Sequence, residues 1–340
     1  MSEEGVTSIR PEPARRRPRV AVLTADTIAI PYNATTLDDL ADVTYTDADG
    51  LAKELPGASV LLMWDFFSPA LVEAWPTADT LQWIHVAAAG VDSLLFDDLR
   101  DSPVVVTNAR GVFDQPIAEF VAASVLAHDK RLHESSRLQR RHVWQHREVT
   151  RTEGSAVLVV GTGGIGRACA RVLRALGMHV TGAGRTSRDD DGDFGRVLAT
   201  DRLTEHLGAF DHVVLAAPLT DQTRGLVGAA ELAAMKSSAH LVNVGRGALV
   251  DEPALLDALR SGVIAAASLD VFENEPLPAD HPFWDLDQVN ISAHMCGDVV
   301  GWRDVLADQF EANLRRWVHG ESPADVVDKT TGYVPRDASS

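Results

Sequence analysis

Three short segments of the chain each place polar side chains directly after an apolar run. "LVNVGRGALVDEPAL" carries Arg246, "SLDVFENEPLP" carries Asp270, Glu273 and Glu275, and "VNISAHMCGD" carries His294. Short apolar runs of this kind are typical of buried parallel strands. We therefore expect these side chains at the carboxyl ends of neighbouring strands, where open α/β sheets bind their ligands.

An arginine, a carboxylate and a histidine at one sheet edge would suit hydride transfer to a 2-keto acid. Arg246 would hold the substrate carboxylate and polarise the carbonyl group, and His294 would deliver the proton. A carboxylate bonded to the other ring nitrogen would favour the charged form of the histidine. The residues alone do not decide which carboxylate does this, and a single histidine or arginine is more often structural or a surface charge.

A glycine-rich loop, "VLVVGTGGIGRACARVLRALGM", predicts a dinucleotide site. Gly161 allows a tight turn, Gly163 lets the backbone approach a pyrophosphate, and Gly166 lets helix and strand pack closely. The loop joins an apolar strand to an amphipathic helix, whose N-terminus favours anions. Gly164 and Ile165 of the same loop are expected to contact the cofactor.

The end of the next strand, "HVTGAGRTSR", indicates which dinucleotide is bound. NAD would need an acidic residue there, but Gly184 stands in its place, followed by Arg185, Ser187 and Arg188. Two guanidinium groups and two hydroxyls, those of Thr186 and Ser187, suit a 2′-phosphate, so NADP(H) is preferred over NAD(H). The alternative is that both arginines are ordinary surface charges. The acids that follow, 189–191, are interpreted as a solvated loop.

Two α/β units are expected to position these residues. The first has strands at 19–24, 59–64, 81–86 and 103–108, with helical segments such as "TLDDLADV" and "ALVEAW" between them. From Gln115 to Trp144 the apolar spacing predicts one long helix. The second unit has strands at 156–161, 178–184, 211–218, 239–245, 264–272 and 289–294. A final helix carries Leu306, Phe310, Leu314 and Trp317 on one face and ends at Gly320.

Length, charge and cysteine content set limits on the class of protein. A chain of 340 residues suits about two domains, and a net charge of −18 argues against nucleic acid as the partner. No apolar run approaches the roughly 18 residues of a membrane span. Two cysteines, Cys169 and Cys296, favour a reducing cytoplasm. No metal site is expected, and the cluster Arg15, Arg16, Arg17 and Arg19 is interpreted as a solvated lead-in.

Five ordered motifs resemble those of the D-isomer-specific 2-hydroxyacid dehydrogenases, over roughly residues 20 to 332. They are "GTGGIGRACARVLRALGM", "APLTDQTRGLVG", "LVNVGRGALVDEPAL", "LDVFENEPLP" and "SAHMCGD". The terminal "VVDKTTGY" resembles the tail of the glyoxylate/hydroxypyruvate reductase branch. The resemblance implies reduction of a small 2-keto acid to the D-2-hydroxy acid, with NADPH or NADH as the hydride donor.

The same resemblance implies residue roles. The catalytic trio would be Arg246, Glu275 and His294, so the glutamate before the proline is chosen over Glu273. Asp270 would face the nicotinamide carboxamide. Further cofactor contacts are implied for Ala217, Pro218, Thr223, Val244, Gly245 and Gly297. The substrate carboxylate would be bound by backbone N–H groups of Ala89, Gly90 and Val91 in "HVAAAGVDSL".

The implied fold is α/β with two doubly wound parallel sheets. Residues 1–113 and 302–340 would form a discontinuous, flavodoxin-like substrate domain. Residues 114–301 would form a Rossmann cofactor domain inserted in it, with a hinge at the two crossings. A cytoplasmic homodimer is the implied assembly.

Some features depart from the family pattern or leave other functions open. Met295 and Cys296 intervene between His294 and Gly297, and Cys296 is expected to be a neutral thiol near the site. Phe113, Trp144 and Trp302 would line an apolar pocket. Formate dehydrogenase-like members would be expected to carry glutamine in place of Glu275. A short phosphoglycerate dehydrogenase and an NAD(P)-sensing module like the family's corepressors remain alternatives.

Overall fold

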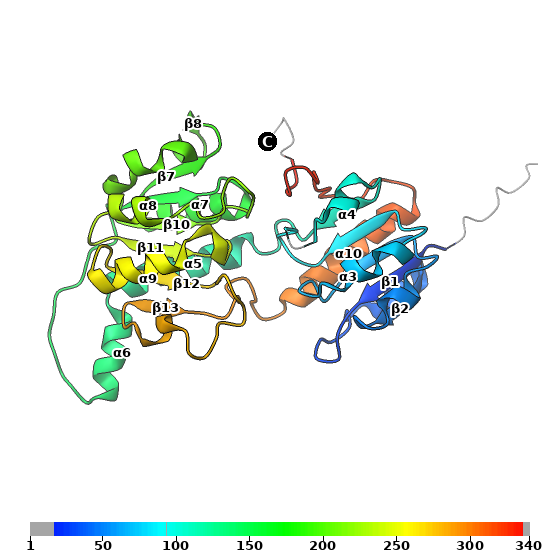
Figure 1. Ribbon diagram of the computed structural model, residues 1–340, viewed down its shortest axis with the longest axis horizontal. Helices are drawn as coiled ribbons and strands as arrows, with labels where there is room; N and C mark the ends of the chain where they lie inside the picture. Colours follow the sequence, from blue (N-terminus) through cyan, green and yellow to red (C-terminus); the bar gives the residue numbers. More distant parts are fainter. Residues whose placement is uncertain (1–16, 93, 336–340) are drawn as a thin grey trace, which may run out of the picture.

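The computed structural model describes residues 17–92 and 94–335, which form two α/β lobes, each built around one sheet (Figure 1). Of the expected basic lead-in, Arg15 and Arg16 lie outside the described residues, as do residues 336–340. Arg17 lies 3.6 Å from a carboxylate oxygen of Asp42, and Arg19 lies 3.1 Å from one of Glu54. The described part of the lead-in is therefore ion-paired to the first lobe.

The first lobe contains a parallel sheet of five strands in the order β2-β1-β3-β4-β5. This order is that of flavodoxin-like folds. The strands are β1 (Arg19–Leu23), β2 (Asp42–Thr46), β3 (Val60–Met63), β4 (Trp83–Val86) and β5 (Val105–Asn108). The helices and turns are α1 (Ala34–Leu40), α2 (Leu51–Glu54), α3 (Ala70–Ala74), η1 (Trp75–Thr77) and α4 (Asp97–Asp101).

Strand β2 is the element of this lobe that the apolar pattern did not predict. The segment "TLDDLADV" was expected to be helical, but its helix ends at Leu40 and the strand begins at Asp42. β2 is an edge strand whose residues are only partly buried. An edge strand needs no continuous apolar run, so the sequence carried only a weak signal for it.

The second lobe contains an eight-stranded sheet in the order β13-β12-β11-β10-β6-β7-β9-β8. Its strands are β6 (Ala156–Val160), β7 (His179–Gly184), β8 (Arg188–Asp191), β9 (Gly195–Ala199), β10 (His212–Leu215), β11 (His240–Asn243), β12 (Ala266–Leu269) and β13 (Val289–Ile291). All pairs are parallel except β8 with β9. Six strands were predicted, and β8 and β9 are additional. The predicted α/β fold with two parallel sheets is confirmed, and one edge of the larger sheet is antiparallel.

Helices cover the faces of this second sheet. They are α7 (Gly164–Ala175), α8 (Ala229–Ala234) and α9 (Glu252–Ser261), with short 3-10 turns η2 (Thr200–Glu205), η3 (Leu207–Ala209), η4 (Gly247–Leu249) and η5 (Pro282–Asp285). Helix α9 shows why the sequence folds this way. The side chain of Asp251 caps its N-terminus by accepting the N–H of Ala254, and Gly262 ends it in the left-handed conformation with φ of 71°.

The predicted long helix from Gln115 to Trp144 is wrong, because two helices stand in its place. α5 (Asp114–Asp129) and α6 (Leu132–Arg140) are separated by Lys130 and Arg131. Arg131 has a positive φ of 52°, a conformation that cannot continue a right-handed helix. α6 and the loop after it project from the outer edge of the second lobe (Figure 1). Periodicity alone did not show this break.

The last helix, α10 (Trp302–Val318), returns to the first lobe (Figure 1). Leu306, Phe310 and Leu314 are buried, as the sequence predicted, and Phe310 stacks on Trp83 at 5.5 Å. Domain boundaries at 113/114 and 301/302 stay a prediction. Within residues 17–92 and 94–335, no helix is long and apolar enough to cross a membrane.

Candidate active site

The carboxyl ends of β11, β12 and β13 meet at one edge of the second sheet, because these strands are parallel neighbours. Arg246 follows β11, the loop with Glu275 follows β12, and His294 follows β13. Three segments that are separate in the chain are thereby brought together, as the sequence predicted they would be.

His294 and Glu275 form a direct pair. Nδ1 of His294 lies 2.7 Å from Oε2 of Glu275, and each side chain is about a third exposed. Oε1 of Glu275 accepts the N–H of Phe272 at 2.8 Å. Burial alone would raise the pKa of Glu275, but His294, this N–H and the charge of Arg246 outweigh it, so its pKa is below the usual value. Glu275 is therefore a carboxylate at neutral pH, and Nε2 of His294 is the nitrogen left for a substrate.

Asp270 fixes the loop that carries His294 through hydrogen bonds. His294 has a positive φ of 50°, and its N–H donates to the carbonyl of Asp270 at 2.8 Å. The fully buried carboxylate of Asp270 accepts N–H groups of Met295 at 3.0 Å and Cys296 at 3.1 Å, and the hydroxyl of Ser292. Asp270 was expected to face the nicotinamide. In the structure both its oxygens are bonded to the loop of His294.

The side chain of Arg246, in the second lobe, contacts the first lobe. Its Nε and Nη2 donate to the two carboxylate oxygens of Asp92 at 3.2 Å and 2.9 Å, and Nη1 donates to the carbonyl of Gly245 at 2.8 Å. Gly90 lies so close that a Cβ there would overlap Nη2. The glycine loop of the first lobe and the arginine of the second thus meet. Sequence reasoning missed Asp92, although it lies in the quoted motif "HVAAAGVDSL".

An aromatic cluster borders the histidine. Phe67, which is 66% exposed, lies with its ring 5.5 Å from the imidazole of His294. Phe66 contacts Phe67 at 4.6 Å and Trp302 at 6.2 Å, and Phe113 contacts Trp302 at 5.9 Å. Phe113 and Trp302 are thus in contact, and that they line an apolar pocket stays a prediction. The inclusion of Trp144 is wrong, because Trp144 is fully exposed in the loop after α6.

The dinucleotide loop has the geometry that its glycines predicted. Gly161 has a φ of 109°, and a Cβ there would overlap the carbonyl of Ala216. A Cβ on Gly166 would overlap the carbonyl of Gly161, whereas one on Gly163 would meet nothing within 4 Å. The loop therefore packs closely against its own fold at two glycines. At Gly163, ahead of the N-terminus of α7, it leaves backbone open to an anion.

Asp114, the first residue of α5, is a second residue that sequence reasoning did not single out. Its carboxylate lies against Gly164, where a Cβ would overlap Oδ2. Burial raises the pKa of Asp114, and the charges of Arg110 and Arg171 offset this only in part. A carboxyl group of raised pKa therefore stands beside the loop expected to bind phosphates.

Both arginines expected to bind a 2′-phosphate have protein partners. The guanidinium of Arg185 lies over the ring of Tyr333, with its carbon 5.3 Å from the centroid, and donates to the tyrosine hydroxyl. Arg188 donates to Asp191 through Nε at 2.8 Å, and Ser187 is exposed. Tyr333 belongs to the C-terminal segment, which the side chain of Lys329 anchors to the carbonyl of Leu99 at 2.9 Å.

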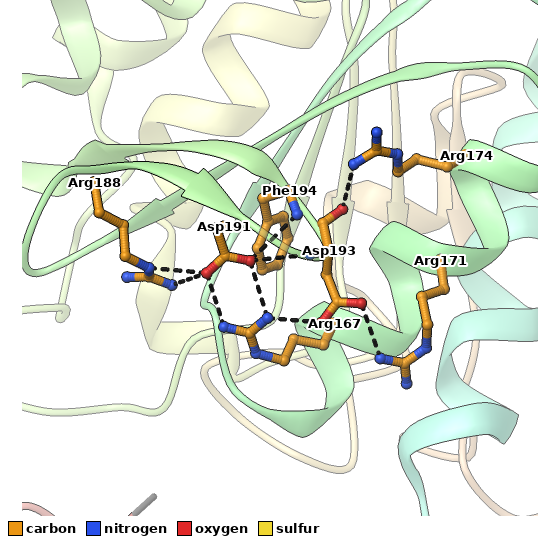
Figure 2. A network of polar contacts seen from close by, with 7 residues as sticks. All are labelled: Arg167, Arg171, Arg174, Arg188, Asp191, Asp193 and Phe194. Atoms are coloured by element: carbon orange, nitrogen blue, oxygen red, sulfur yellow. Dashed lines mark hydrogen bonds and ion pairs between the residues drawn. The ribbon is translucent and has the colours of Figure 1, made fainter. Parts of the chain in front are cut away.

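The interpretation of residues 189–191 as a solvated loop is wrong for Asp191. The residues form strand β8, and the side chain of Asp191 is only 4% exposed. Figure 2 shows its carboxylate between Arg188 and Arg167, each of which lies within 2.9 Å. Burial would raise the pKa of Asp191, but the two arginines and the N–H groups of Asp193 and Phe194 lower it well below the usual range.

The same cluster fixes helix α7 to the β8–β9 hairpin. Asp193 accepts from Arg167 at 2.6 Å and from Arg171 at 3.3 Å, and its carbonyl accepts from Arg174 at 2.8 Å (Figure 2). The three arginines lie on one face of α7 at spacings of three and four residues, which the sequence pattern could have shown. Their partners could not be foreseen, because the hairpin itself was not predicted.

The remaining predicted residues line the same edge of the second sheet or the loop of the first. Thr223 bonds the carbonyl of Pro218 at 2.7 Å, and so ties its own loop together next to the buried Ala217. The N–H of Gly245 donates to Asn243 at 3.1 Å. Also at these edges lie Val244, which is buried, Ile165, which packs on the core, Gly297, whose Cβ would lie 2.7 Å from Phe113, and Ala89 and Val91 beside Gly90.

The arrangement as a whole can bind an anion and move a proton. Arg246, which is paired with Asp92, and the backbone around Gly90 form a donor-rich surface, and the His294–Glu275 pair stands beside it. Cys296 stays a neutral thiol, because burial and the neighbouring Asp270 raise its pKa. In the described part of the chain, no three His, Cys, Asp or Glu side chains are placed to hold a metal ion.

Comparison with known proteins places this site in a family. Residues 122–296 match the family model for the D-isomer specific 2-hydroxyacid dehydrogenase NAD binding domain. A glyoxylate reductase from Korarchaeum cryptofilum is 32% identical over 269 residues, covering 77% of this chain and 80% of the reductase.

Solved structures agree with this. A D-isomer specific 2-hydroxyacid dehydrogenase from Xanthobacter autotrophicus, in complex with NADPH, matches with a TM-score of 0.80 and 32% identity over 93% of this chain and all of its own. An NADPH-dependent glyoxylate/hydroxypyruvate reductase from Sinorhizobium meliloti, in complex with NADP, matches with a TM-score of 0.79 and 27% identity, over 94% of this chain and all of its own.

Proposed function

The chain belongs to the D-isomer specific 2-hydroxyacid dehydrogenase family of NAD(P)-dependent oxidoreductases, and we propose that it reduces a small 2-keto acid such as glyoxylate or hydroxypyruvate. The single observation that carries the proposal is the 2.7 Å bond between His294 and Glu275 on the sheet edge that also bears Arg246. A proton donor held by a carboxylate, beside a carboxylate-binding arginine, is what carbonyl reduction requires.

In the proposed reaction each residue acts at a defined atom. Arg246 and the backbone N–H groups of the loop at Ala89, Gly90 and Val91 bind the substrate carboxylate. Nε2 of His294 donates the proton to the carbonyl oxygen, and Glu275 stabilises the charged ring through Nδ1. The bound nicotinamide supplies the hydride. The product is the D-2-hydroxy acid.

The glycine loop fits a dinucleotide. Gly163 leaves open space ahead of the N-terminus of α7, and the close packing at Gly161 and Gly166 fixes the loop around that space. The proposed cofactor contacts are the loop residues 161 and 163–166, residues 217, 218 and 223 on the adenosine side, and residues 244, 245 and 297 near the nicotinamide. Asp270 is proposed to act on the nicotinamide side only through the loop of His294, to which both its carboxylate oxygens are bonded.

A substrate panel tests the proposal directly. The protein is mixed with NADPH or NADH and with glyoxylate, hydroxypyruvate, phenylpyruvate or 3-phosphohydroxypyruvate, and nicotinamide absorbance is followed. Turnover of glyoxylate or hydroxypyruvate is expected. Tight cofactor binding without turnover of any 2-keto acid would instead support a nucleotide-sensing module, and preference for the phosphorylated substrate would support a short phosphoglycerate dehydrogenase.

We further propose that NADP(H) is the preferred cofactor. The support is the absence of an acid at Gly184, the position where NAD enzymes bind ribose hydroxyls, together with Arg185 next to it. Arg188 contributes less than its position suggested, because it is paired with Asp191. Arg185→Asp should erode the preference for NADPH, measured as the ratio of kcat/KM with the two cofactors. An unchanged ratio would refute the phosphate site.

A cytoplasmic homodimer completes the proposal. The support for a second copy is the projecting arm made of α6 and the following loop, which leaves Leu132, Trp144 and Val149 more than half exposed. Exposed apolar side chains gathered on one projecting segment are typical of an interface. The compartment is supported by both cysteines, 169 and 296, being free.

A further inference from the structure

We infer that Asp92 is a positioning residue for the reaction, holding the guanidinium group of Arg246 in the orientation that meets the substrate. The inference rests on the proposed function, because it assigns Arg246 the substrate carboxylate. Asp92 belongs to the first lobe, in the loop after β4, and Arg246 belongs to the second, after β11. Their contact therefore joins the two lobes at the site itself.

The contact has the geometry of a strong, directional pair. Two parallel bonds, Nη2 to Oδ1 at 2.9 Å and Nε to Oδ2 at 3.2 Å, join one edge of the guanidinium to the carboxylate. Both side chains are about two-thirds buried or more. Paired bonds of this kind fix the plane of the arginine as well as its position, which a single contact would not do.

The remaining contacts of Arg246 show which part of it stays available. A guanidinium carries five N–H donors. Two are used by Asp92 and one by the carbonyl of Gly245 at 2.8 Å. One N–H on each terminal nitrogen has no partner among residues 17–92 and 94–335. Asp92 thus occupies one edge of the group and leaves donors on both terminal nitrogens for a substrate.

Gly90 packs directly against this pair and so restricts the orientation of the guanidinium group of Arg246. A Cβ there would overlap Nη2 of Arg246 and would lie 2.9 Å from Oδ1 of Asp92. The pair is therefore formed directly on the loop whose backbone N–H groups are proposed to bind the substrate carboxylate. Only a residue without a side chain allows loop, arginine and aspartate to meet in this way.

The opposite interpretation is that Asp92 competes with the substrate for Arg246, since both offer a carboxylate. The two interpretations predict different kinetics. A positioning residue, when lost, lowers kcat as well as the affinity for the keto acid, because the carbonyl is no longer polarised in the right place. A competitor, when lost, lowers KM and leaves kcat unchanged.

The test is steady-state kinetics of Asp92→Asn with saturating NADPH and glyoxylate. Loss of a charge-assisted bond predicts a fall in kcat/KM of about 10- to 100-fold, including a fall in kcat, with unchanged NADPH affinity. The isotope effect with NADPH deuterated at the transferred position should grow, because hydride transfer becomes slower. Asp92→Glu, which keeps the charge, should recover part of the loss. Asp98→Asn on α4, an exposed acid with no described partner, is the matched control.

Several outcomes would overturn the inference. Wild-type kinetics of Asp92→Asn, or a lower KM at unchanged kcat, would each do so. A wild-type enzyme inactive on every 2-keto acid would instead refute the proposed function, which is a distinguishable result. If Asp92→Asn does not fold, Gly90→Ala serves, because its Cβ would displace Nη2 of Arg246 and crowd Oδ1 of Asp92 while the aspartate itself is kept. A normal kcat in that variant would count against the inference.

Discussion

His294 is held in place from two directions, by Glu275 at Nδ1 and by Asp270 through the backbone of its loop. The ring has one nitrogen left for chemistry, so its removal should affect proton delivery and little else. His294→Ala is expected to lower kcat by about 10²- to 10⁴-fold, the usual contribution of a positioned acid. NADPH affinity, measured by fluorescence titration, should stay the same. Near-normal turnover would remove His294 from its proposed role.

The two glutamates of the loop after β12 allow a matched comparison. Glu275 is bonded to the ring of His294, whereas the contact described for Glu273 is the bond from its backbone N–H to Glu252 at 2.6 Å. Glu275→Gln removes the charge that favours the imidazolium form. The pH above which the reduction rate declines should therefore move to lower values. Glu273→Gln should leave the pH profile unchanged, and an identical shift in both variants would contradict the assignment.

Asp191 gives a prediction about stability and pH. Its pKa is depressed in the folded protein by Arg167 and Arg188, so its contribution is complete above the ordinary range of aspartate and is lost as pH falls through the depressed value. Asp191→Asn should lower the free energy of unfolding by about 1–3 kcal/mol at pH 7. Urea denaturation at pH 7 and pH 3 should show this difference shrinking in acid. Asp189→Asn is the control, because Asp189 is 82% exposed. A difference that is the same at both pH values would argue against the ion pairs as its source.

At the scale of elements, substitutions in the turn between β6 and α7 should distinguish effects on cofactor binding from effects on folding. A Cβ on Gly163 meets nothing, and the backbone there is in an ordinary extended conformation, so Gly163→Ala should fold normally. It should nevertheless weaken NADPH binding by about tenfold or more, because the methyl group would occupy the proposed phosphate position. Gly166→Ala should weaken NADPH binding and also destabilise the fold. Its Cβ would overlap the carbonyl of Gly161, which should lower the free energy of unfolding by about 1–3 kcal/mol. Calorimetric titration and thermal unfolding would show whether the two effects separate.

The sequence predicted the buried strands well and the exposed elements poorly. β3 and β6 are continuous apolar runs, and β1, β10 and β12 are buried and largely apolar, as sheets covered on both faces require. β2 and β8 are edge strands with partly exposed residues, and β8 reads "RDDD", a run that carries no apolar signal. The break at Arg131 depends on one positive φ, which no periodicity reveals.

For the functional residues, the sequence predicted which side chains stand at strand ends, but not which side chains they contact. Arg246, Glu275 and His294 follow adjacent strands, so their meeting could be foreseen, although only family resemblance chose between the glutamates. Asp92 could not be paired with Arg246, because the two belong to different lobes whose approach no local pattern encodes. Asp191 was misread because acids in a row are usually solvated, and its two arginine partners lie on a hairpin and a helix.

At the scale of the whole molecule, the projecting arm predicts assembly. Trp144 is fully exposed, which a single copy of the chain would not maintain without cost. Light scattering is expected to give about twice the chain mass of 36.6 kDa. Trp144→Glu should shift the population towards the monomer, whereas Val72→Glu, at a half-exposed site in the first lobe, should not. A monomeric wild-type protein would contradict the proposed dimer.

The C-terminal segment spans both lobes, since Lys329 is anchored to the first and Tyr333 lies on Arg185 of the second. Whoever purifies this enzyme should therefore choose with care which end receives an affinity tag. A tag placed shortly after Tyr333 should alter the apparent NADPH affinity. A tag ahead of β1 is joined to the first lobe and is far from Arg185 in the sequence. It is the better choice for measuring cofactor preference.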